Sequence, residues 1–325
     1  MGWWQITADT LASSRFVLSP LAEATSALIA LERGEPSHPG DHTWFTTHRP
    51  AYRDRLAADP VTALLIRSAL GHSWLADFLT PTPTGIGDPT FHDELAAVRA
   101  TPPEAARTHL TVSLAGPLPA RLHRTDLPER TADLLDWVWT ETVLPYWPRR
   151  RRILEADVVA RIQHLSQGGW AAAIGGMRPG MRWLGESRLQ VNAHEYPPRD
   201  LTGSQLFFVP VTPPHGWVSW DSGRRHAVVY PCSGALADPL TPTTSAPESL
   251  RRLLGPGRAA VLALLDAPKS TTQLVALTGQ GLGSVGRHLK VLHDAHLIAR
   301  RRTGRSVLYY RTPTGETLIH TQPPT

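Results

Sequence analysis

The chain contains 325 residues with a formal net charge of +5, which is long enough for two domains with sizeable cores. A single cysteine excludes an internal disulfide, which suits a reducing compartment. Because no apolar run reaches about 18 residues and no charged segment precedes an apolar stretch at the start, the sequence predicts a soluble cytoplasmic protein with no membrane partner.

The first 175 residues have mostly helical patterns. The ranges 21–31, 127–146 and 147–165 each predict a helix, and Pro148 separates the last two. From about residue 182 the pattern changes, and short β-rich stretches separated by proline and glycine predict strands at 188–192, 205–209, 217–220 and 227–230. The expected fold class is therefore α+β, with a mostly helical N-terminal domain that contains a small antiparallel β portion.

A stretch rich in proline, threonine, serine and alanine at 238–247 predicts a linker between an N-terminal domain, 1–237, and a C-terminal domain, 248–325. All eleven tryptophans precede the linker, so the N-terminal domain is expected to build its own aromatic-rich core. Tryptophan-lined walls also suit a flat or apolar small molecule. We therefore expect this domain to sense an unidentified small-molecule effector or to mediate dimerisation, with no cofactor.

Residues 270–311 contain the most informative pattern. Ser270 and Gln273 have the spacing of a capping box, which predicts that a short helix begins there. Gly279 suits the left-handed residue at which such a helix ends. A second helix is expected over about 283–295, and two β-rich stretches with glycine between them predict a hairpin after it.

The second predicted helix has two unlike sides. At about 100° per residue, one side is an apolar stripe and the other is basic. The stripe comprises Val285, Leu289, Leu292 and His296, whereas Arg287 and Lys290 lie opposite and His288 lies at the border. Arginine and lysine donate to guanine O6 and N7 or to phosphate, so the basic side suits the major groove of DNA.

The order helix, turn, helix and basic hairpin predicts a winged helix-turn-helix. Its expected DNA contacts are Arg287, His288 and Lys290 in the groove, Thr272 and Ser284 on phosphates, and Arg300, Arg301, Arg302 and Arg305 on the wing. From residue 248 onward there are eleven basic and four acidic residues, a net charge of +7, whereas the rest of the chain has 22 and 24, a net charge of −2. This concentration is typical of binding driven by counterion release.

The run Leu289-Lys290-Val291-Leu292, with Arg287-His288 before it and DAHLI and RRTGRSVLYY after it, resembles the ArsR-type winged-helix repressors of bacteria. The resemblance covers about the last quarter of the chain. It implies a homodimer that binds a (pseudo)palindromic operator in double-stranded DNA and is released by an effector. The N-terminal domain is similar to the uncharacterised helical domains that winged-helix regulators of actinobacterial composition often have.

The chain departs from this family at two places. Gly281 and Gly286 stand where the family usually has serine, and Gly283 adds a third glycine to the same helix, at a cost of about 1 kcal/mol for each glycine in a helix interior. The family's metal sensors have cysteines in the helix before the turn, whereas this helix has none. Thiolate metal sensing at that position is therefore excluded.

Other motifs suggest other chemistry. Residues 281–286 match the dinucleotide fingerprint G-x-G-x-x-G, but the capping box predicts a helix where the fingerprint needs a strand. His293 with His296, and Glu316 with His320, have metal-ligand spacing without further ligands nearby, which favours a structural interpretation. The run 149–152, four arginines, contacts nucleic acid or forms a solvated helix start.

The residues favour a DNA-binding regulator, and no catalytic motif or carboxylate pair indicates an enzyme. The alternative is an N-terminal enzyme or ligand-binding domain on which the winged helix is a module for protein interaction or dimerisation. The three glycines of the second helix favour this alternative. DNA affinity of residues 248–325 at two salt concentrations would separate the two hypotheses.

Overall fold

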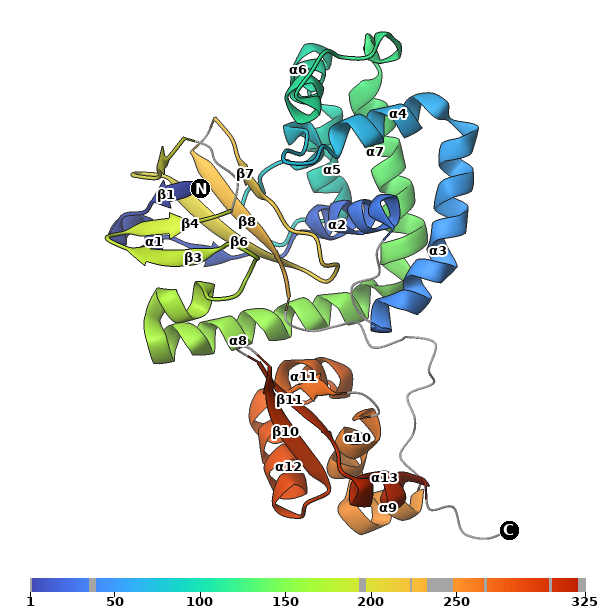
Figure 1. The fold of residues 1–325 in the computed structure, drawn as a ribbon, viewed down its shortest axis with the longest axis vertical. Coiled ribbons are helices and arrows are strands. Elements are labelled where there is room, and N and C mark those ends of the chain that lie inside the picture. The colour runs from blue at the N-terminus through green and yellow to red at the C-terminus, as the bar shows by residue number, and fades with distance from the viewer. Residues whose placement is uncertain are drawn as a thin grey trace.

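The computed structural model describes residues 2–34, 39–192, 197–222, 224–232, 248–265, 268–303 and 306–320. The fold is a mixture of helices and small sheets. Residues up to 232 form one larger body, and residues from 248 onward form a smaller body below it in Figure 1. Each body has its own hydrophobic core. The predicted linker, 238–247, lies outside the described residues.

Most helices of the larger body lie on one side of it, whereas the first lies among the strands and the last runs along the bottom of this body (Figure 1). The helices are α1 (Ala8–Ala12), α2 (Pro20–Arg33), α3 (Pro39–Ala58), α4 (Pro60–Ala69), α5 (Phe91–Arg99), α6 (Pro103–Leu114), α7 (Leu127–Val138) and α8 (Trp147–Ile174). Four single turns accompany them: η1 (Asp77–Leu79), η2 (Ala120–Leu122), η3 (Trp139–Val143) and η4 (Leu144–Tyr146). Ser19 begins α2 by accepting a hydrogen bond from the Ala22 N–H, and Gly34 ends it in the left-handed conformation.

The structure confirms the helix predicted at 21–31 as α2 and modifies the other two. Residues 127–146 are α7 followed by a π-helical turn, η3, and a 3-10 turn, η4. The third helix continues past residue 165 to Ile174, but Gly168 and Gly169 have non-helical dihedral angles. The chain changes direction at these two glycines, and Arg161 Nη1 donates across the break to the carbonyls of Ala173 and Gly175 at 3.0 and 3.1 Å.

Two four-stranded sheets form the other side of the larger body. Their strands are β1 (Trp3–Gln5), β2 (Arg15–Phe16), β3 (Arg182–Gly185), β4 (Arg188–Gln190), β5 (Arg199–Asp200), β6 (Gln205–Val211), β7 (Val218–Trp220) and β8 (Arg225–Pro231). The sheet orders are β3-β4-β1-β5 and β2-β6-β8-β7. The strands predicted from residue 188 onward are present as β4, β6, β7 and β8.

The expectation of an antiparallel β portion was wrong, because both sheets are mixed. Strand β6 runs parallel to both β2 and β8, and β1 runs parallel to β5. The reason is that β6 and β8 are covered on both faces. Phe207 and Val229 pack toward α2, whereas Phe208 and Tyr230 pack toward the other sheet and the end of α8. Continuous apolar runs of this kind are typical of parallel strands.

A buried ion pair joins the helices to the sheet. Arg150 and Glu23 both have side chains that are 0% exposed, and Arg150 Nη1 lies 2.6 Å from Glu23 Oε1. Thr212, directly after β6, donates its N–H to Glu23 Oε2 at 2.8 Å and its hydroxyl accepts from Arg150 Nη1 at 3.2 Å. The guanidinium also lies 5.0 Å from the ring centroid of Trp44 in α3. Four elements therefore meet at one pair of charges.

The arginine run at 149–152 is thus neither a simple solvated helix start nor a free basic patch. Arg150 is in the core, and Arg151 is paired at the surface with Asp88 and Glu155, at 2.8 and 2.9 Å. The exception is Arg152, which is exposed and close to the smaller body. A Cβ placed on Gly279 would lie 3.9 Å from its Nη1.

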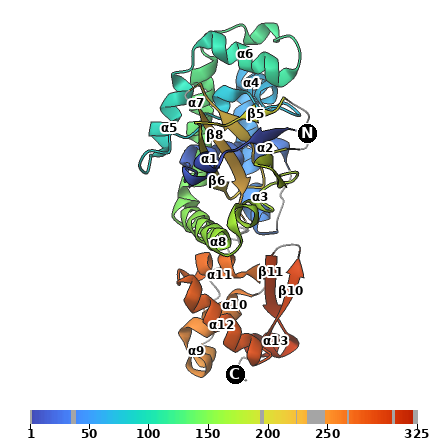
Figure 2. The same ribbon diagram turned by 90° about the vertical axis from the view of Figure 1, so that its left-hand side faces the viewer.

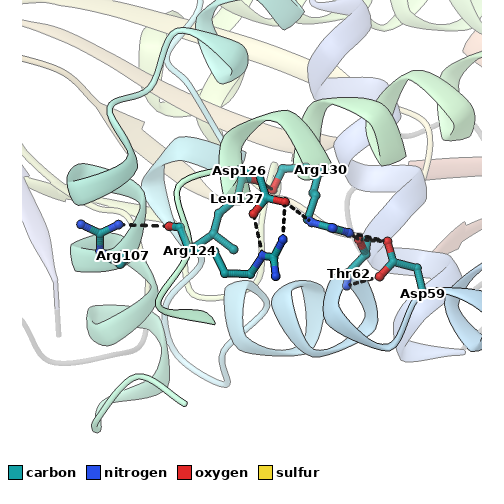
Figure 3. A network of polar contacts seen from close by, with 8 residues as sticks. Asp59, Thr62, Arg107, Arg124, Asp126, Leu127 and Arg130 are labelled. Atoms are coloured by element: carbon teal, nitrogen blue, oxygen red, sulfur yellow. Dashed lines mark hydrogen bonds and ion pairs between the residues drawn. The ribbon is translucent and has the colours of Figure 1, made fainter. Parts of the chain in front are cut away.

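A charged network at the surface joins α4 to α7 (Figure 3). Asp59 caps α4 by accepting from the Thr62 N–H, and Arg130 Nη1 donates to Asp59 at 2.7 Å. Arg130 Nε also donates to the carboxylate of Asp126. The same carboxylate accepts hydrogen bonds from Nε and Nη2 of Arg124 at 2.7 and 2.8 Å. These donors, those of Arg124 most of all, lower the pKa of Asp126 below its usual range. A surface depression of about 470 Å³ at this network has charges that are paired with one another, which indicates a structural role.

The smaller body contains α9 (Glu248–Leu254), α10 (Pro256–Leu264), β9 (Lys269–Ser270), α11 (Thr271–Thr278), α12 (Leu282–Asp294), β10 (Ile298–Thr303), β11 (Ser306–Arg311) and α13 (Pro313–His320). The three strands form an antiparallel sheet of order β10-β11-β9. The predicted capping box of Ser270 and Gln273 is present, and Gly279 ends α11 with φ of 67°. Helix α11 lies against α8 of the larger body in both views (Figures 1 and 2).

Substitution of Glu23 tests the buried ion pair. Glu23→Ala leaves the Arg150 guanidinium buried without its anion, so we expect the free energy of unfolding to fall by about 3–5 kcal/mol in urea denaturation. The matched control is Arg151→Ala, next to Arg150 on α8. This variant loses only ion pairs at the surface and should lower the free energy of unfolding by less than about 1 kcal/mol. If both variants lose the same small amount of unfolding free energy, the buried pair stabilises the fold no more than an exposed pair does.

Candidate nucleic-acid interface

Helix α12 has the two sides that the sequence predicts. Val285, Leu289 and Leu292 are buried, with at most 2% of each residue exposed, in the core of the smaller body. Arg287 and Lys290 are exposed on the opposite side. The helix therefore packs with its apolar stripe and presents two cations to solvent.

The prediction was wrong for one member of the apolar stripe. His296 was expected to be buried with Val285, but it lies beyond the end of α12, is exposed and has a left-handed φ of 55°. The helix ends at Asp294, so the helical spacing no longer applies at residue 296. Its carbonyl accepts from the Thr312 hydroxyl at 2.7 Å, which holds the turn into β10.

Two of the expected DNA contacts have partners within the protein. Ser284 Oγ donates to Gln280 Oε1 at 3.1 Å and lies 3.4 Å from His288 Nε2. The His288 ring lies over Gly257 at the start of α10, where an added Cβ would be 2.5 Å from Nε2. Burial, with Arg258 and Arg287 nearby, lowers the pKa of His288, so its ring is largely neutral at pH 7. Thr272, in the first turn of α11, is half-buried.

The hairpin supplies further cations. Arg300, Arg301 and Arg302 are consecutive exposed residues of β10, paired with Tyr309, Leu308 and Val307 of β11. Because side chains alternate along a strand, Arg301 lies on the face opposite the other two. Arg305, also expected to contact DNA, lies outside the described residues.

Three glycines leave part of the backbone of α12 uncovered by side chains on its outward side. Added Cβ atoms at Gly281, Gly283 and Gly286 would meet no heavy atom within 4 Å. By helical spacing, Gly283 lies on the same side as Arg287 and Lys290. Gly281 is also the N-cap residue, so no side chain caps the first N–H groups of α12. A partner can therefore approach the backbone of α12 closely beside its two cations.

The other chemical interpretations gain no support. Residues 274–277, where a dinucleotide fingerprint needs a strand, belong to helix α11. Within the described ranges, no three histidine, cysteine or acidic side chains are grouped to hold a metal ion. Glu316 is paired with Arg311 at 3.0 Å. None of the described helices combines the length and the apolar character needed to cross a membrane.

No family model, curated protein or solved structure to which the chain was compared matches it.

The sequence analysis missed the contacts that fix His288. Gly257 and Arg258 lie in α10, about thirty residues before α12, and the only available signal was a glycine in the first turn of an otherwise apolar helix. Such a glycine is typical of a site where another group approaches the backbone closely.

Two glycine substitutions test this geometry. Gly286→Ala adds a methyl group to open space within a helix, so the free energy of unfolding should rise by about 0.5–1 kcal/mol. Gly257→Ala is the matched control, because its methyl group displaces the His288 ring, and stability should fall by about 1 kcal/mol. A thermal denaturation series in which Gly286→Ala is the more damaging variant would contradict the described placement of α12.

Proposed function

We propose that this chain is a DNA-binding transcriptional regulator with a winged helix-turn-helix of the ArsR type in residues 248–325. The observation that carries the proposal is the outward side of α12, where Arg287 and Lys290 are exposed opposite a buried apolar stripe. The +7 net charge of this part of the chain supports the same interpretation, because cations that displace counterions drive association with DNA.

In this proposal α12 enters the major groove and the hairpin lies along the backbone. Arg287 binds a guanine edge in a bidentate manner, and Lys290 binds a base edge or a phosphate. The uncapped N–H groups at the start of α12 suit a phosphate, and the glycines beside the cations allow close approach. Arg300 and Arg302, which share one face of β10, bind phosphates and fix the register of the helix, whereas Arg301 lies on the other face.

The remaining parts of the proposal come from the resemblance to the ArsR type. A homodimer would place two copies of α12 on the half-sites of a (pseudo)palindromic operator, about one helical turn apart. The regulator acts as a repressor in the cytoplasm, and the N-terminal part binds the effector.

The alternative function is a module for protein interaction or dimerisation. The contact of α11 with α8 favours it, since one side of the smaller body already serves as a protein interface. The two functions differ in their dependence on salt. DNA binding weakens steeply as salt rises, whereas association through apolar surfaces does not.

Substitution of the two cations tests the groove contact. We expect Arg287→Ala to weaken binding to a fragment of the protein's own promoter by about 1–3 kcal/mol in fluorescence anisotropy, and Arg287→Ala/Lys290→Ala to weaken it further. Arg151→Ala, an exposed arginine of the larger body, is the control and should bind like the wild type. Wild-type affinity of the double variant would refute the role of α12.

Removal of one hairpin cation tests the phosphate contacts separately. Arg302→Ala should weaken binding to all sequences alike and reduce the slope of log K against log salt by about one unit. An unchanged slope would remove this strand from the phosphate contacts while leaving the groove contact intact.

A further inference from the structure

A pocket in the larger body lies between the helices and the sheet, far in sequence from α12. It has a volume of about 300 Å³ and is formed by the end of α2, the connection 71–80, residues 178 and 179 after α8, Asn192, the connection 214–218 and Pro231. This volume is at the lower end of the range for small-molecule sites.

The charge of the pocket favours an anion. Its ionisable lining residues include two guanidinium groups, Arg33 and Arg178, and one carboxylate, Asp77. Burial, together with the nearby Arg33, lowers the pKa of His215 to about 4, so this imidazole is neutral at pH 7. The lining therefore has a net charge of about +1 at neutral pH.

The two arginines are placed differently. Arg178 is held by the backbone, since its Nη1 donates to the Val191 carbonyl at 3.4 Å and its Nη2 to the Gly216 carbonyl at 3.2 Å. Arg33 is exposed at the end of α2, and among the described residues it has no carboxylate partner. A planar guanidinium fork of this kind suits a carboxylate, which can accept two parallel hydrogen bonds.

Hydrogen-bonding groups in the walls also remain unused. Trp217 is 7% exposed, and within the described residues its indole Nε1 is buried without a hydrogen-bond partner, as is His215 Nε2. An indole N–H can only donate, so its natural partner is an acceptor. The apolar part of the lining, which includes Ile29, Trp74 and Trp217, suits the faces of a flat ring.

We propose that this pocket binds a small planar carboxylate, one aromatic ring with one carboxyl group. The carboxylate lies at Arg33 and Arg178, and the ring lies against Trp74 and Trp217. Binding is a property of the larger body alone. The further step, that such a ligand acts as the effector of DNA binding, rests on the proposed function.

Calorimetric titration of the full chain tests the site. The probes are benzoate and indole-3-carboxylate, with benzamide and indole-3-carboxamide as neutral isosteres. We expect saturable binding of the carboxylates with one site per chain, and at least about tenfold weaker binding of the amides. Absence of saturable binding up to about 10 mM, or equal affinity for acid and amide, overturns the proposal.

Variants locate the binding. Arg33→Gln, at an exposed position with no carboxylate partner among the described residues, should weaken benzoate binding at least about tenfold without lowering the melting temperature. Trp217→Phe keeps a ring but removes the N–H, and should weaken binding about fivefold. If both variants bind benzoate like the wild type, the carboxylate is bound elsewhere and the proposal fails.

A cross-comparison separates this inference from the proposed function. Arg287→Ala should bind benzoate like the wild type, and Arg33→Gln should bind promoter DNA like the wild type in the absence of benzoate. Loss of benzoate binding in Arg287→Ala would contradict the pocket assignment. Failure of the wild type to bind DNA would refute the regulator and leave the carboxylate site standing.

Discussion

The buried pair of Glu23 and Arg150 is the constraint on which the larger body depends. Two ions removed from water are stable only when each is satisfied by the other and by further hydrogen bonds. Here Thr212 binds both ions from the end of β6 and Trp44 covers the guanidinium, whereas Nε and Nη2 of Arg150 have no hydrogen-bond partner among the described residues. The pair therefore fixes α2, α3 and α8 on the sheet in one arrangement, because any shift would separate charges that water cannot reach.

Helix α8 extends this constraint to both candidate sites. Its first turns contain Arg150, and Arg152 lies close to the end of α11 in the smaller body. Asp157 and Arg161 bind the sheet and the returning chain, through Tyr230 and the carbonyls near residue 174. The chain then leads to Arg178 in the wall of the carboxylate pocket. One helix thus contains part of the ion pair and contacts the smaller body, and it ends a few residues before Arg178, after a break in the helical dihedral angles at Gly168 and Gly169.

Signals within a few residues of one another were sufficient to predict two helices of the smaller body. A capping box, a left-handed glycine and helical spacing identify α11 and α12, and they place Arg287 and Lys290 outward. Spacing failed at His296 because it assumes that the helix continues. In the larger body the positions of β4, β6, β7 and β8 were predicted, whereas those of β1, β2, β3 and β5 were not. Strand directions were not predicted either, since pairing depends on segments far apart in the chain. Strands β1 and β2, for example, join sheets whose other strands begin after residue 180.

The same limit applies to the sites. The DNA-contact candidates lie within forty residues of one another, so a periodic pattern brings them together. The residues of the proposed carboxylate pocket come from six separate segments between residues 29 and 231, and no spacing relates Arg33 to Arg178 or Trp217. The burial of Arg150 was equally hidden, because an arginine run reads as a surface feature until its partner, 127 residues away, is known.

The most direct test of the account is to incubate the full-length protein with fragments of its own genome and to sequence those it retains at low and at high salt. The account predicts retention of a small set of promoter fragments that share a (pseudo)palindrome with half-sites about one helical turn apart, and loss of that retention as salt rises. Retention without a shared sequence, or no retention at low salt, would contradict it.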